Sequence, residues 1–164
     1  MGSNKGKIGS VDTLANVTYS LGVGALTDFW SGLNALGVLS SRLSSVPLNI
    51  VTGSPYALWT EKLYSWTKTK KESSQSRKFL VDLLAFNTFQ VPVYGVALAV
   101  GSVCSQTEVD WKKVESGMTH LAQISPFIAP TLRMYTNSLR KIFGIKSISE
   151  GAYRNEREEA EDGN

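Results

Sequence analysis

The sequence predicts an all-α integral membrane protein with four transmembrane helices and both termini in the cytoplasm. Long uncharged segments alternate with short charged ones, and the longest, residues 83–107, has 25 residues without a formal charge. That length exceeds the roughly 20 residues that a helix needs to cross a bilayer. The tryptophans lie at the ends of the uncharged segments or between them, as expected for aromatic belts at membrane interfaces.

Average composition hides this pattern, because charge is segregated along the chain. The 164 residues are 42% hydrophobic and their mean hydropathy is −0.08, values that are ordinary for a soluble protein. A soluble helical bundle is therefore the alternative fold. Residues 1–143 hold 14 Lys/Arg and 8 Asp/Glu, a balance of +6, whereas residues 144–164 hold 3 and 6, a balance of −3.

We accordingly divide the chain into three parts. Residues 1–10 are expected to form a cytoplasmic N-terminus, residues 11–143 the four-helix transmembrane domain, and residues 144–164 a charged cytoplasmic tail. The tail is too polar to bury a core, so we expect it to be a solvated helix or disordered.

The first helix is predicted over residues 12–39. It contains 15 uncharged residues, 13–27, and is short and glycine-rich for a membrane span. Asp12 and Asp28 would lie near its two ends. An ordinary amphipathic helix is the alternative for this segment.

The second helix is predicted over residues 40–66. Three polar side chains recur every seven positions and therefore share one helix face: Arg42, Asn49 and Tyr56. Pro47 and Pro55 each remove a backbone donor and are predicted to kink the helix. The alternative is a turn at Gly53-Ser54-Pro55 between two short helices.

A basic segment, residues 62–78, follows the second helix and contains six Lys/Arg. Such density between two spans marks the cytoplasmic side of a membrane protein. The segment lacks interleaved aromatic residues, which argues against a nucleic-acid partner.

The third helix, residues 79–101, combines an apolar sequence with polar residues. Asp82 stands at its entrance, and Gln90, Pro92 and Tyr94 lie inside it. Polar groups in hydrocarbon are costly and usually face a bundle interior or a transport pathway. Pro92 is a further predicted kink. Small residues between Gly95 and Gly101 would allow close packing on another helix or a second copy of the chain, so we expect a homo-oligomer.

The fourth helix is predicted over residues 116–143, after a nearly neutral loop. Its uncharged part contains Pro126 and Pro130, which are predicted to kink it, and Arg133 follows. Arg140 and Lys141 close the segment on the side that already carries the basic residues.

The residue inventory excludes several kinds of chemistry. One cysteine, Cys104, cannot form an internal disulfide or a cysteine-based metal site, and one histidine, His120, cannot form a histidine cluster. The chain has no nucleotide-binding loop, so ATP hydrolysis is not expected. We predict that the protein is not an enzyme and uses neither a metal nor another cofactor.

Several motifs resemble those of the L-alanine exporter family (AlaE-like), which consists of small bacterial inner-membrane proteins with four transmembrane helices. The resemblance covers residues 11–103 and begins with Asp12-Thr13 and Asp28. Its main blocks are Ser41-Arg42-Leu43, Val46-Pro47-Leu48-Asn49-Ile50, Pro55-Tyr56, Asp82-Leu83-Leu84-Ala85, Thr88-Phe89-Gln90 and Pro92-Val93-Tyr94. The fourth helix departs from the family pattern through its prolines and Arg133.

The resemblance implies a multi-pass protein of the bacterial inner membrane that exports L-alanine by antiport driven by the proton-motive force, with other small neutral amino acids as further candidate substrates. Its partners would be L-alanine, protons and the lipid bilayer. We expect Asp82 to exchange the proton, with Arg42 as its partner or as the group that holds the alanine carboxylate. The expected pathway residues are Asp12, Arg42, Asn49, Tyr56, Asp82, Gln90 and Tyr94. The alternatives are a membrane adaptor that transports nothing and a soluble interaction domain.

Overall fold

The computed structural model describes residues 4–30, 34–104 and 108–153. These residues form four long α-helices and one short 3-10 helix and include no strand: α1 Asn4–Trp30, α2 Ala35–Trp66, α3 Gln75–Cys104, α4 Trp111–Ile142 and η1 Ile148–Glu150. The predicted all-helical class is confirmed, but several boundaries differ. The second helix begins at Ala35 rather than at residue 40, and the fourth begins at Trp111 rather than at residue 116.

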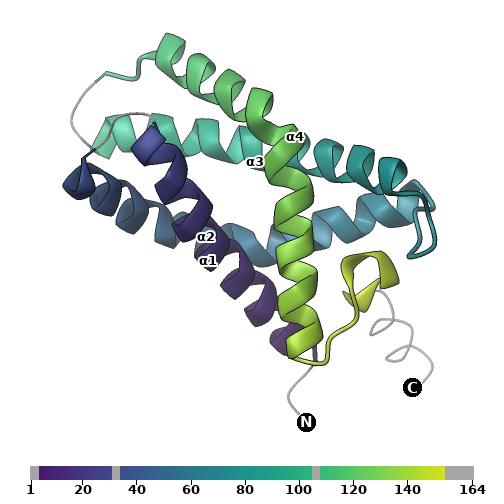
Figure 1. Cartoon of the computed structure of the whole chain (residues 1–164). Helices are drawn as coiled ribbons and strands as arrows, with labels where there is room; N and C mark the ends of the chain where they lie inside the picture. The colour runs from purple at the N-terminus through teal and green to yellow at the C-terminus, as the bar shows by residue number, and fades with distance from the viewer. Residues whose placement is uncertain (1–3, 31–33, 105–107, 154–164) are drawn as a thin grey trace.

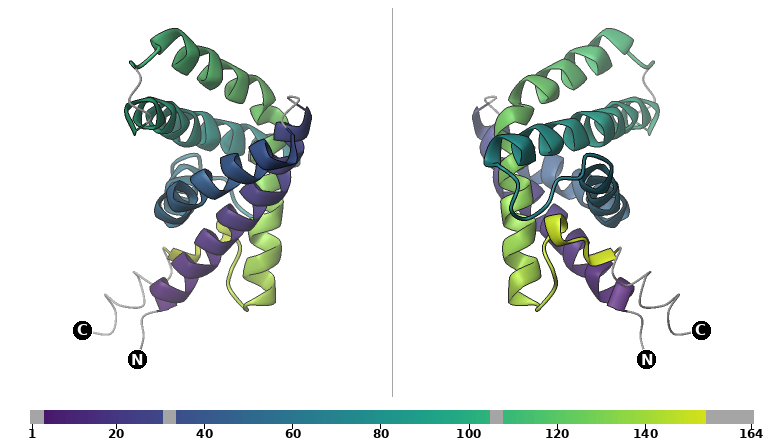
Figure 2. Two further views of the ribbon diagram at one scale, coloured as in Figure 1. Left: turned by 90° about the vertical axis from the view of Figure 1, so that its left-hand side faces the viewer. Right: turned by 90° about the vertical axis from the view of Figure 1, so that its right-hand side faces the viewer.

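Two helix pairs form the body of the fold, α1 with α2 and α3 with α4; α1 crosses α2 at a wide angle, and the second half of α4 turns across α3 (Figures 1 and 2). Contacts of α1 with α4 and of α2 with α3 join the pairs. The start of α1 and the end of α4 lie side by side at the bottom of Figure 1, the loop between α2 and α3 lies at its right, and η1 lies between them. A glycine at residue 53 permits close approach within the first pair, since a Cβ there would lie 2.7 Å from Thr13 Cα.

The prolines lie within continuous helices. α2 runs through Pro47 and Pro55, and α3 runs through Pro92. The alternative of a turn at Gly53-Ser54-Pro55 is therefore wrong. α4 changes direction near its middle (Figure 1), where Pro126 and Pro130 lie, and a proline inside a helix removes one hydrogen bond and bends the axis.

A single turn redirects the chain after α4. Gly144 adopts φ 69°, and its N–H donates to Lys141 O while the N–H of Ile145 donates to Arg140 O. This pattern ends a helix with a left-handed residue that glycine adopts without strain. The chain then folds back, and Ile148, Ala152 and Tyr153 become buried. The expectation of a solvated or disordered tail is thus wrong for residues 145–153, and residues 154–164 lie outside the described part of the chain.

Residues 145–153, which we call the closing segment, are joined to the α2–α3 loop by an ion pair at the protein surface. Lys71 Nζ lies 2.7 Å from Glu150 Oε1. The hydrogen bond from Lys71, with further donors from Ser147, lowers the pKa of Glu150 to about 2. In turn the pKa of Lys71 is raised by the hydrogen bond to Glu150.

The distribution of polarity differs from that in a typical soluble protein, because charged side chains lie beside apolar ones in the interior and many large apolar side chains are exposed. Charged side chains are buried in the interior, including Asp12, Asp82 and Arg140, each at most 2% exposed. Large apolar side chains cover the outside: Leu26, Leu36, Val51, Phe127 and Ile142 are each at least 68% exposed. Among the described residues, every buried side-chain nitrogen or oxygen has a hydrogen-bond partner. One described helix segment, Gln75–Val96 of α3, is long and apolar enough to cross a membrane.

Candidate functional site

The first buried charge site joins three helices around Asp82. Its carboxylate accepts a hydrogen bond from the hydroxyl of Tyr64 of α2 at 2.7 Å and forms an ion pair with Arg133 of α4 at 2.5 Å. Asp82 is 1% exposed. We call Asp82, Tyr64 and Arg133 the Asp82 cluster. In this structure the partner of Asp82 is Arg133, whereas Arg42 lies toward the other end of α2 and donates to Ser20 O. The alternative role of Arg42, to hold the alanine carboxylate, stays a prediction.

The second buried charge site, the Asp12 cluster, consists of Asp12, Glu61, Arg140 and Tyr153. The Arg140 guanidinium donates to both oxygens of Asp12, Nε to Oδ1 and Nη2 to Oδ2, each at 2.7 Å. It also donates from Nη1 to Glu61 at 2.9 Å. Two carboxylates therefore share one guanidinium, which leaves a net charge of −1 when all three are ionised.

Tyr153 completes the Asp12 cluster from the closing segment. Its hydroxyl donates to Asp12 Oδ2 at 2.6 Å, and its backbone N–H donates to Glu61 Oε2 at 3.0 Å. The Arg140 guanidinium lies 5.5 Å from the centre of the Tyr153 ring, within the range of a cation–π contact. The cluster thus ties α1, α2, α4 and the closing segment together.

A third polar cluster, which we call the amide group, consists of uncharged side chains. Asn16 Nδ2 donates to the side chain of Asn49 at 3.2 Å, Asn49 Nδ2 donates to Ser20 Oγ at 2.8 Å, and Gln90 Nε2 donates to Asn16 Oδ1 at 3.4 Å. This group brings together two of the predicted pathway residues, Asn49 and Gln90, and adds Asn16, which the sequence did not single out.

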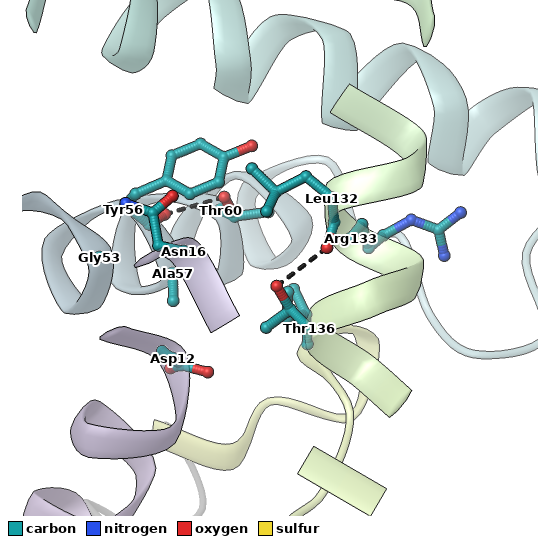
Figure 3. A pocket seen from close by; sticks show the side chains of 10 residues that line it. Asp12, Asn16, Gly53, Tyr56, Ala57, Thr60, Leu132, Arg133 and Thr136 are labelled. Carbon is teal, nitrogen blue, oxygen red and sulfur yellow. Dashed lines mark hydrogen bonds between the residues drawn. The ribbon is translucent and has the colours of Figure 1, made fainter. Parts of the chain in front are cut away.

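A small cavity lies between α1, α2 and α4, next to the Asp12 cluster (Figure 3). Its polar lining includes Asp12, Asn16, Thr60 and Thr136, and its apolar lining includes Ala57, Leu132 and Ile148. Arg133 also borders it, but its guanidinium points away from the other labelled side chains (Figure 3). The space open to the centre of a water molecule is about 10 Å³, at the lower limit for one water. The cavity is therefore closed to a molecule the size of an amino acid.

The structure distributes the predicted pathway residues unevenly. Asp12 and Tyr56 line the cavity, and the Tyr56 ring packs against Phe86 and Phe89. Asp82 lies in its own cluster, and Asn49 and Gln90 lie in the amide group. Tyr94 is 39% exposed and belongs to none of these sites.

Sequence reasoning missed Glu61, Tyr64, Arg133, Arg140 and Tyr153 as members of these sites. A usable pattern existed for the two arginines: they stand seven residues apart in α4 and so face the same way. Among the described residues, no three His, Cys, Asp or Glu side chains are placed to hold a metal ion.

Comparison with known proteins gives one family. The sequence model of that family, described as "AlaE: L-alanine exporter", matches residues 3–146. Three relatives share the name "L-alanine exporter AlaE". The protein from Citrobacter koseri is 30% identical over 83% of this chain and 87% of its own length. The one from Cereibacter sphaeroides is 36% identical over 55% and 65%, and that from Escherichia coli K12 is 29% identical over 82% and 86%. No solved structure matches the chain.

Proposed function

The chain belongs to the L-alanine exporter family AlaE, and on this premise we propose that it carries L-alanine out of the bacterial cytoplasm by antiport driven by the proton-motive force. The family function is transport, which is not enzymatic. A membrane adaptor without transport activity is not favoured, because the relatives are named as exporters. The proposal extends to other small neutral amino acids, which differ from alanine only in a small side chain.

We propose that all four long helices cross the inner membrane. They contain 27 to 32 residues and are therefore about 40–48 Å long, enough to span a bilayer. The exposed apolar side chains and the buried charged ones support the proposal, because lipid solvates apolar side chains, whereas a charged side chain that faces lipid is costly. Five exposed basic residues lie in or beside the α2–α3 loop, which favours the cytoplasm for that end and for both termini: Lys62, Lys68, Lys70, Lys71 and Arg77.

The Asp82 cluster supports a role for Asp82 in proton coupling. The carboxylate is buried in the most apolar helix and its charge is balanced by Arg133. Protonation would remove the negative charge and leave the Arg133 guanidinium without its partner. Because Arg133 lies on the half of α4 beyond Pro126 and Pro130, that half-helix would gain freedom to move. Protonation of Asp82 would therefore loosen α4, which borders the cavity.

The number of subunits stays a prediction. Four helices are few to enclose a pathway, so we propose a homo-oligomer. Gly95, one of the small residues expected at a subunit contact, instead packs against Met118 of α4 within the chain.

Alanine efflux from loaded cells tests the function. We expect cells that express the chain to lose alanine faster than cells without it, and an uncoupler to abolish the difference. The Asp82→Asn variant should insert normally and lose efflux. The matched control is Glu72→Gln, which changes an exposed carboxylate of the loop and should retain it. Absence of efflux with the unmodified chain would disprove export, whereas full efflux by Asp82→Asn would disprove only the role of Asp82.

A further inference from the structure

The closing segment covers the cavity at the end of the molecule that we assign to the cytoplasm. Ile148 of this segment lines the cavity together with Asp12 and is 4% exposed. Its N–H donates to Asn137 Oδ1 at 2.9 Å. Ala152 and Tyr153 pack against Ile8 of α1 and Ala57 of α2. The segment therefore seals the cavity by apolar contacts and is fixed by hydrogen bonds at both of its ends.

The charge of the Asp12 cluster indicates that its ligand would be a cation. Asp12 and Glu61 share one guanidinium, so when all three groups are ionised one negative charge is not balanced by a cation within the Asp12 cluster. Burial of an unbalanced charge is costly. Tyr153 supplies a hydrogen bond to Asp12 Oδ2 but no charge. A primary ammonium group would supply both the hydrogen bonds and the charge.

We propose that Asp12 binds the ammonium group of the exported amino acid, and that in the closed state shown here the Tyr153 hydroxyl takes the place of that group. The proposal deepens the export function and rests on it. The hydroxyl donates to a cavity-lining carboxylate oxygen as an N–H of the ammonium would. Release of the closing segment then opens the cavity and exposes Asp12 oxygen in a single movement.

The remaining lining suits a small zwitterion. Ala57 and Leu132 offer apolar contacts for a methyl group. The Asn16 amide donates to Asn49 in the closed state and would exchange that bond to hold the carboxylate. Because the closed cavity holds no more than about one water, the amino acid enters only when the closing segment has moved. Substrate and Tyr153 therefore compete for the same acceptor.

Competition is tested with the full-length chain in proteoliposomes, by the exchange of labelled L-alanine at varied alanine concentration. Tyr153→Phe keeps the ring and removes the hydroxyl. We expect its half-saturating alanine concentration to fall about tenfold, because a hydrogen bond to a charged group no longer opposes binding. The matched control is Tyr135→Phe, whose hydroxyl contacts Thr18 outside the cavity. This control should exchange like the unmodified chain.

Two analogues of alanine identify the group that Asp12 binds. Ethylamine keeps the ammonium and lacks the carboxylate, and propionate keeps the carboxylate and lacks the ammonium. Ethylamine should inhibit exchange by the unmodified chain. Asp12→Asn should raise the half-saturating alanine concentration at least tenfold and abolish inhibition by ethylamine, while any inhibition by propionate persists.

The outcomes separate this proposal from the export function. If the unmodified chain exchanges alanine but Tyr153→Phe has an unchanged or raised half-saturating concentration, the proposal is overturned and export stands. If the unmodified chain exchanges nothing, the export function itself is wrong. Asp12→Asn can fail to insert, and Tyr153→Phe then still decides. Hydrogen exchange gives a second measurement: saturating alanine should deprotect the amides of residues 148–153, and unchanged protection would overturn closure by this segment.

Discussion

Arg140 offers the sharpest test of how the helices are held together. It is 0% exposed and donates to Asp12, Glu61 and the backbone oxygen of Lys146. Arg140→Gln removes the cation and leaves two buried carboxylates without a charge partner. Loss of one member of a buried ion pair costs about 3–5 kcal/mol. For a chain of this size that corresponds to a fall in melting temperature of roughly 6–20 °C.

The measurement is thermal unfolding of the purified chain in detergent. Lys141→Gln is the matched control, because Lys141 is the next residue and its side chain is exposed. Its free energy of unfolding should change by less than about 0.5 kcal/mol. The double variant Arg140→Gln/Glu61→Gln should be more stable than Arg140→Gln by about 1–3 kcal/mol, because one unpaired carboxylate is removed. A melting temperature for Arg140→Gln equal to that of the control would refute this account, as would a double variant no more stable than the single one.

Three further outcomes are expected. Gly53→Ala should destabilise the chain by about 1–3 kcal/mol in chemical unfolding, because the new Cβ would lie 2.7 Å from the backbone of Thr13. Gly95→Ala should cost less in the same assay, because the neighbour is a flexible methionine side chain; a larger cost than for Gly53→Ala would contradict this. The stabilisation from the Lys71–Glu150 pair should be constant between about pH 5 and 9. Since the pKa of Glu150 is lowered to about 2 from 4.5, the contribution is fully present above pH 4.5 and is lost as the pH falls toward 2. The difference in melting temperature between the unmodified chain and Lys71→Gln measures it, and a difference that persists at pH 2 would count against the pairing.

The helical class and the number of helices could be predicted from the alternation of uncharged and charged segments. Boundaries could not, because charge marks where a helix leaves an apolar environment and not where its hydrogen bonds end. α2 starts at Ala35, before Arg42, and continues through Lys62, the first residue of the basic segment, to Trp66. The prolines of α2 left a turn open as the alternative, but α2 is continuous through both of them, because a helix can lose single backbone bonds and remain intact.

The candidate site was predicted in part. Asp82 stood out because an acid in a long apolar segment is rare, but its partner Arg133 lies 51 residues away on another helix, and no local pattern joins the two. Tyr153 was hidden for a different reason. It lies in a segment whose composition predicts solvation, and the turn at Gly144 that folds it back is a backbone property of one residue.

The spacing of Arg133 and Arg140 has a mechanical consequence. Both lie beyond the prolines of α4, two helical turns or about 10 Å apart, and one reaches α3 while the other reaches α1 and α2. A rigid half-helix cannot turn about its axis or slide along it without displacing both guanidiniums. When one of the two arginine contacts breaks, the other alone holds the half-helix in place. The Asp82 and Asp12 clusters are therefore coupled directly through this half-helix.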